Sequence, residues 1–285
     1  PTPTTQAPSD VAAGCSAERP GDVVAGQTVV RTMESGATER SYRLYVPASI
    51  ADGQAVALVM NWHGRGSNAL EQELYSALAP VSEREGFILV MPEGINGQFL
   101  TNPGVDDVQF ARDLVRVLAS EFCTDPARVF STGMSNGAFM STQLACQAAD
   151  LVAAVAPSAG ATPADGGSCP TAVPILVFAG VDDAVVPYGP DGLILGVLPY
   201  IGMEAAVQTW AESNGCEGSA DSAVGEAVAL REFSGCEATT RMYIVEGGGH
   251  TWPGAIDIPG LGPTTHEISA TELIWEFFAA HSGEE

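Results

Sequence analysis

Gly133-Met134-Ser135-Asn136-Gly137 is the stretch that decides the fold, because it places a serine where a predicted strand must turn sharply into a helix. Residues 129–132 before it read as a short strand, and residues 138–146 after it carry the apolar stripe of a helix. A Gly-x-Ser-x-Gly turn in this context is typical of a nucleophile elbow. The serine backbone there is strained, and a Cβ at either flanking position would collide with the neighbouring strand or helix. An ordinary turn is the alternative in a chain with 32 glycines, but the flanking strand and helix favour the elbow.

Strand-like and helix-like segments alternate along the rest of the chain. Residues 56–60 and 87–91 are continuous apolar runs, as expected of strands buried on both faces of a parallel sheet, whereas residues 40–46 alternate like a half-exposed edge strand. This alternation predicts a doubly wound, mostly parallel α/β sheet flanked by helices. No second linker or large lid insertion is evident, so we expect one domain over residues 15–285 after a flexible extension over residues 1–14. Further strands are predicted at 152–156, 175–179 and 242–245, and helices at 69–85, 106–122, 136–148, 202–214 and 269–281.

The chain is strongly acidic, with a net charge of −24 and arginine as its only basic residue apart from histidine. Such a field repels phosphate backbones and anionic membrane surfaces, which argues against nucleic acid, membrane and polyanionic partners. The charge serves either solubility or adaptation to salt. No apolar run is long enough for a transmembrane helix.

Six cysteines without a C-x-x-C pair favour three disulfides over a zinc site, and therefore a secreted, extracellular protein. Buried free thiols are the alternative. Six cysteines allow 15 pairings. A hairpin-like excursion favours Cys216–Cys236, from which Cys146–Cys169 and Cys15–Cys123 follow.

The serine needs a base, an orienting acid and an oxyanion hole. His250 lies in a glycine-rich loop beyond a strand's carboxyl end, whereas His63, His266 and His281 read as structural or surface residues. Either Asp182 or Asp183 follows another strand end and gives the order Ser…Asp…His of α/β-hydrolases. We expect the oxyanion hole to use the backbone N–H groups of Asn136, after the nucleophile, and of Arg65, in the loop after residues 56–61. No metal or organic cofactor is required.

Several sequence blocks in this order resemble the secreted esterase and poly(3-hydroxybutyrate) depolymerase family, which includes feruloyl and acetylxylan esterases. The resemblance implies an α/β-hydrolase fold and selects Asp183 as the acid. It also implies that Trp252 lines the substrate groove. The family usually has a small residue or Cys where Arg65 stands, so the acyl preference is open. The blocks are His63-Gly64, Val105-Asp106-Asp107-Val108, Gly133–Gly137, Val185-Val186-Pro187-Tyr188, Gly249–Gly254 and Ala270–Phe278.

The function predicted from these features is a secreted, monomeric serine esterase acting on a neutral ester or polyester. Polyesters of the poly(3-hydroxybutyrate) type, including aromatic polyesters, rank first, and feruloyl or acetyl esters of plant polysaccharide are the alternative. A non-catalytic binding module on the same scaffold is a third reading. Trp62, Tyr188 and Tyr200 join Trp252 as candidate groove residues, with a core position as the alternative for Trp62 and Tyr188. The apolar residues 192–201 either pack against the body or form an exposed substrate wall.

Overall fold

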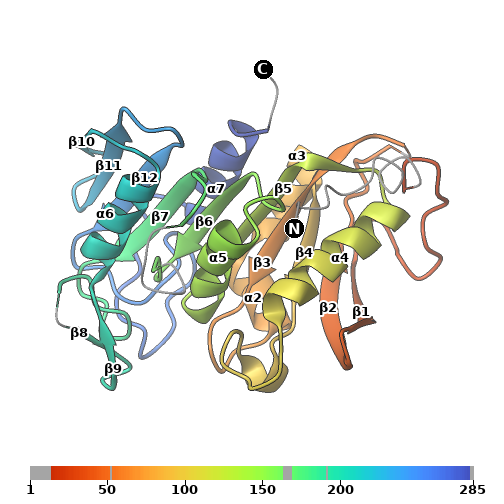
Figure 1. The fold of residues 1–285 in the computed structure, drawn as a ribbon, viewed down its shortest axis with the longest axis horizontal. Helices are drawn as coiled ribbons and strands as arrows, with labels where there is room; N and C mark the ends of the chain where they lie inside the picture. The colour runs from red at the N-terminus through yellow and green to blue at the C-terminus, as the bar shows by residue number, and fades with distance from the viewer. Residues whose placement is uncertain (1–13, 52, 163–168, 191, 283–285) are drawn as a thin grey trace.

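The computed structural model describes residues 14–51, 53–162, 169–190 and 192–282, so the predicted extension lies outside the described residues except for Gly14. A ten-stranded sheet runs through the molecule in the order β1-β2-β4-β3-β5-β6-β7-β12-β11-β10 (Figure 1). The six strands from β4 to β12 are mutually parallel, and antiparallel pairs extend the sheet at both edges. The strands are β1 (Thr28–Ser35), β2 (Thr38–Tyr45), β3 (Val56–Trp62), β4 (Ile88–Pro92), β5 (Thr124–Met134), β6 (Ala154–Ser158), β7 (Ile175–Gly180), β10 (Gly218–Ala223), β11 (Val228–Ser234) and β12 (Thr240–Val245).

The apolar runs at residues 56–60 and 87–91 form the central strands β3 and β4, and every residue of both strands is buried. Burial on both faces is the reason for their continuous apolar sequence. The prediction of an edge strand at residues 40–46 was wrong. β2 pairs with β1 on one side and with β4 on the other, and its alternating sequence follows from having one face less covered than the other.

Helices cover both faces of the sheet (Figure 1). One buried apolar cluster joins α4, α5 and α6 to the sheet, and a second joins α2, α3 and α7 to its other face. The helix predicted over residues 69–85 is two helices, because Ala77 takes a left-handed conformation (φ 49°, ψ 33°) between them. The helices are α2 (Ala69–Ser76), α3 (Leu78–Glu85), α4 (Asp107–Glu121), α5 (Asn136–Gln147), α6 (Met203–Ser213) and α7 (Ala270–Ala279), with a 3-10 turn η1 (Ile95–Gly97).

Two hairpins lie at the margins of this architecture. A separate hairpin of β8 (Gly192–Ile194) and β9 (Leu198–Tyr200) projects below the sheet in Figure 1. The hairpin β10–β11 ends the sheet, and every residue of β10 is exposed. It lies between the bonded Cys216 and Cys236, as the sequence predicted.

The structure also joins Cys146 to Cys169 and Cys15 to Cys123, the pairs expected from the sequence. Within the described ranges, no helix is both long and apolar enough to cross a bilayer.

Candidate active site

Ser135 occupies the tight turn between β5 and α5. Its backbone lies at φ 56° and ψ −115°, a strained conformation for a residue with a side chain. The flanking glycines are required sterically, since a Cβ on Gly137 would lie 2.1 Å from the Trp62 carbonyl oxygen and one on Gly133 would lie 2.6 Å from it. The Ser135 amide donates to the Ser158 carbonyl of the neighbouring strand at 2.9 Å. The turn therefore has the backbone geometry of a nucleophile elbow.

His250 and Asp183 meet at the carboxyl ends of β12 and β7. The distance from His250 Nδ1 to Asp183 Oδ2 is 2.7 Å, and both residues are buried, with exposed fractions of 4% and 6%. The other Asp183 oxygen accepts from the amides of Val185 and Val186 at 2.7 and 2.8 Å. These bonds fix the carboxylate, which can in turn hold the imidazole with its proton on Nδ1 and leave Nε2 free to act as a base. Asp182, in contrast, is exposed.

Ser135 and His250 line one cavity of about 560 Å³. Gly64 and Arg65 border it beside the serine, and a Cβ on Gly64 would lie 3.6 Å from Ser135 Cβ. The remaining wall is mainly apolar. Its apolar members are Leu74, Tyr75, Met134, Ile256, Ile258 and Leu261.

The two amides expected to bind an oxyanion are available. Asn136 is the first residue of α5, so its backbone N–H has no partner within the helix. The backbone N–H of Arg65 makes no turn or loop hydrogen bond to a described residue. The Asn136 side chain is engaged elsewhere, because Oδ1 accepts from the Phe99 amide at 2.7 Å and Nδ2 donates to the Phe99 carbonyl at 3.1 Å. The residue after Ser135 is thus held by the loop around Phe99.

His63 shapes the loop that carries Arg65. Its ring is fully buried, Nδ1 lies 2.8 Å from the Gly64 carbonyl, and Nε2 accepts from the Gly94 amide at 2.9 Å. Burial lowers the pKa of His63, against the raising effects of the bond to Gly64 and the nearby charges of Glu93 and Glu71. A neutral ring with its proton on Nδ1 satisfies both contacts, which fits the structural role expected for this residue.

Two of the predicted groove residues are in the core instead. The rings of Trp62 and Trp252 are fully buried, and their Nε1 atoms donate to Ser131 Oγ at 2.9 Å and to Thr271 Oγ1 at 3.0 Å. Neither indole can stack on a substrate, so the groove assignment is wrong for both. Tyr188 is half-buried against the core and does not line the cavity, and Tyr200 is buried.

The cavity wall contains residues that the sequence analysis missed. Tyr75 lies on α2 and its hydroxyl accepts from the Trp252 amide at 3.2 Å. The loop after His250 folds back over the site, because the His250 amide donates to the Leu261 carbonyl at 2.6 Å and thereby brings in Ile256 and Ile258. Only one sequence feature pointed to this wall: an apolar, proline- and glycine-containing segment directly after the candidate base.

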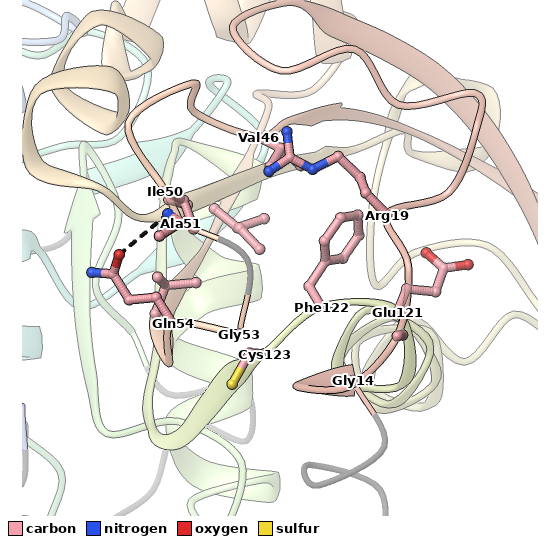
Figure 2. A pocket seen from close by; sticks show the side chains of 13 residues that line it. Gly14, Arg19, Val46, Ile50, Ala51, Gly53, Gln54, Glu121, Phe122 and Cys123 are labelled. Carbon is pink, nitrogen blue, oxygen red and sulfur yellow. Dashed lines mark hydrogen bonds between the residues drawn. The ribbon is translucent and has the colours of Figure 1, made fainter.

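A second pocket lies away from these residues, beside Cys123 (Figure 2). Its volume of about 30 Å³ holds about one water molecule, so it cannot take an organic substrate. In the ranges that the structure describes, no group of three or more His, Cys, Asp or Glu side chains could hold a metal ion.

Known proteins similar to this chain are esterases. A protein of Nocardia uniformis subsp. tsuyamanensis that is named as an esterase, NocK, is 31% identical over an alignment 316 residues long, which covers 97% of this chain and 90% of that protein. The chain belongs to this family of carboxylic ester hydrolases. Feruloyl esterase D of Neurospora crassa is 28% identical over 271 residues, covering 89% of this chain and 86% of that protein. No model of a known protein family matches the chain.

Two further known proteins resemble this chain, one over only part of its own length and the other in its fold. Feruloyl esterase B of Piromyces equi is 32% identical over 220 residues, and the match spans only 41% of that protein's length and 72% of this chain. The solved structure of an acetyl xylan esterase from Aspergillus awamori superposes with a TM-score of 0.66 at 17% identity, covering 88% of this chain and 99% of that one. The esterase therefore has the single-domain α/β-hydrolase fold expected from the sequence.

Proposed function

We propose that this esterase is a secreted serine hydrolase that cleaves feruloyl or acetyl esters of plant polysaccharide through Ser135, His250 and Asp183. The observation that carries the proposal is the 2.7 Å contact between His250 Nδ1 and Asp183 Oδ2 beside a cavity that Ser135 and His250 both line. A nucleophile, a base and an orienting acid in this arrangement make up a catalytic triad. Three disulfides support an extracellular location.

The reaction proceeds by acyl transfer to water in two steps. Ser135 Oγ attacks the ester carbonyl while His250 Nε2 takes its proton, and Asp183 stabilises the imidazolium without being protonated. The carbonyl oxygen becomes an oxyanion on the amides of Arg65 and Asn136, and the alcohol leaves with the proton from His250. Water, activated by His250, then attacks the acyl-enzyme, and the acid departs as Ser135 is restored.

Esters of plant polysaccharide are the alternative to polyesters in the sequence analysis. Two observations now favour them: the names of the similar proteins and the size and lining of the cavity. The similar proteins named above include feruloyl esterases and an acetyl xylan esterase. A cavity of about 560 Å³ with an apolar wall has room for an aromatic acyl group. Tyr75 on that wall supplies an aromatic face, the role first expected of the buried tryptophans.

Polyester hydrolysis, which the sequence analysis ranked first, is kept as a second candidate because of one observation. The β8–β9 hairpin and the residue after it present exposed apolar side chains, as expected of a wall that contacts a hydrophobic polymer. The cavity rim adds Leu74 and Ile256, also exposed. The exposed hairpin residues are Leu193, Leu195, Val197, Leu198 and Ile201.

The test is hydrolysis of methyl ferulate, acetylated xylan and an amorphous poly(3-hydroxybutyrate) film by the wild type and by Ser135→Ala. We expect ferulate or acetate release by the wild type and a loss of at least about a thousandfold in Ser135→Ala, because no nucleophile remains. Film clearing without ferulate or acetate release would favour the polyester reading. No hydrolysis of any substrate by the wild type, together with no labelling by a fluorophosphonate, would leave the binding-module reading.

A further inference from the structure

Arg65 is an exposed cation at the mouth of the cavity that contains Ser135. The structure records no hydrogen bond or ion pair between its guanidinium and any described residue. Its position follows the buried His63 and the glycine that borders Ser135, so the loop backbone is fixed while the side chain is free. A free guanidinium beside the reacting serine can contact a ligand.

The lack of a carboxylate partner contrasts with eight of the other ten arginines of the chain. The sequence has 35 acidic residues and only 11 basic ones, so an arginine rarely lacks a nearby carboxylate. Arg40 and Arg43, for example, bind Asp107 and Glu73 at 2.7 and 2.6 Å. Eight arginines form an ion pair with a carboxylate of the protein: Arg31, Arg40, Arg43, Arg84, Arg112, Arg116, Arg231 and Arg241.

One carboxylate does line the same cavity, but it is directed to another group. Glu71, in the first turn of α2, accepts a hydrogen bond from Ser67 Oγ at 2.6 Å. Glu71 and Arg65 are the two charged side chains, apart from His250 if protonated, on this cavity wall. Because Glu71 is engaged with Ser67, the guanidinium of Arg65 retains its donors for a molecule that enters the cavity.

We propose that Arg65 binds a carboxylate carried by the substrate and so makes the esterase prefer acidic esters. A guanidinium presents paired N–H donors that match the two oxygens of a carboxylate. The carboxylate belongs either to a uronic acid next to the esterified sugar or to the free end of a dicarboxylic acyl group. This inference rests on the proposed function, because it assigns a specificity to the cavity that Ser135 and His250 line.

The experiment compares kcat/KM for matched acidic and neutral esters. One arm uses acetylated xylo-oligosaccharides that carry glucuronate, against the same oligosaccharides with the carboxyl reduced to an alcohol. The other arm uses the mono-4-nitrophenyl ester of glutaric acid against its terminal amide. We expect the wild type to prefer the acidic member of one arm by roughly three- to tenfold, the range of a partly exposed, charge-assisted contact. The arm that responds identifies the source of the carboxylate.

Variants assign the preference to one side chain. Arg65→Gln should bring the acidic-to-neutral ratio close to one, and Arg65→Lys should retain part of it because the charge remains without the paired donors. Arg116→Gln removes the same charge from an exposed helix position and should keep the wild-type ratio. Glu71→Gln should raise the ratio, since it removes a negative charge from the cavity wall.

Two results would overturn the inference: no acidic preference of the wild type in either arm, or an Arg65→Gln ratio equal to that of the wild type. Ser135→Ala separates this failure from failure of the proposed function. Loss of turnover of the neutral esters in Ser135→Ala upholds the proposed function even where Arg65 makes no difference. Unchanged turnover in Ser135→Ala would overturn both.

Discussion

Replacing Asp107 with Asn tests whether a buried ion pair fixes the loop that holds Asn136. Arg40 Nη2 lies 2.7 Å from Asp107 Oδ1, and the two side chains are only 2% and 1% exposed. The second Asp107 oxygen accepts from the Leu100 amide at 2.7 Å. The neighbouring Phe99 makes both bonds to the Asn136 side chain. A weaker anchor at Asp107 should therefore disturb the residue whose amide we assign to the oxyanion hole.

The expected cost is large because the variant leaves a buried charge without its partner. Removing one member of a buried ion pair costs about 3–5 kcal/mol. This is a large fraction of the free energy of unfolding of a typical protein, which is about 5–15 kcal/mol. Arg40 has little to compensate with, since its Nε already lacks a hydrogen-bond partner. Its other contacts are a long hydrogen bond of 3.4 Å from Nη2 to the Glu93 carbonyl and the Phe110 ring, whose centroid lies 3.9 Å from Cζ. The double variant Arg40→Met/Asp107→Leu removes both charges and should be at least about 2 kcal/mol more stable than Asp107→Asn.

Urea unfolding at pH 7 measures these free energies, and kcat on a soluble ester reports on the site. We expect kcat of Asp107→Asn to fall roughly tenfold, less than the 10²–10³ lost when an oxyanion donor is removed outright. Asp150→Asn, in the more exposed pair with Arg112, is the matched control and should cost no more than about 1 kcal/mol. The reasoning fails if Asp107→Asn loses less than about 1 kcal/mol, or if the double variant is as unstable as the single one.

Two further predictions concern buried rings. Burial lowers the pKa of His63 in the folded protein below its value of about 6.5 in the unfolded chain. The free energy of unfolding is therefore unaffected by His63 above about pH 6.5, and it decreases as the pH falls from there through the lowered folded pKa, because only the unfolded chain binds the proton. His63→Gln should flatten the stability profile between about pH 7 and 5 in urea unfolding; a profile parallel to that of the wild type would contradict this. Trp252→Phe should lower the free energy of unfolding by about 1–3 kcal/mol without raising KM, because the indole is buried and donates to Thr271. A raised KM with wild-type stability would instead return this ring to the substrate groove.

The sequence was most informative where local chemistry determines structure. A serine between glycines at a strand end can adopt only a few backbone conformations, so residues 133–137 predicted the elbow, and apolar runs predicted β3 and β4. The sequence was least informative where a residue's position depends on packing between distant parts of the chain. Nothing local distinguishes a buried Trp252 from an exposed one, since its burial depends on packing against distant parts of the chain, Thr271 among them. The cavity wall was missed because Tyr75 and Ile256, 181 positions apart, meet only when the chain is folded.

The edge strand β10 affects whether the sheet can pair with a strand from another molecule. It leaves one sheet edge with unpaired backbone groups, which another chain could extend. Its sequence, Gly218-Ser219-Ala220-Asp221-Ser222-Ala223, has no large apolar side chain and carries a carboxylate. A strand added from a second molecule would therefore gain little apolar contact from β10. At this edge the sheet therefore offers an added strand backbone hydrogen bonds but little side-chain packing, which disfavours extension of the sheet there by a second molecule.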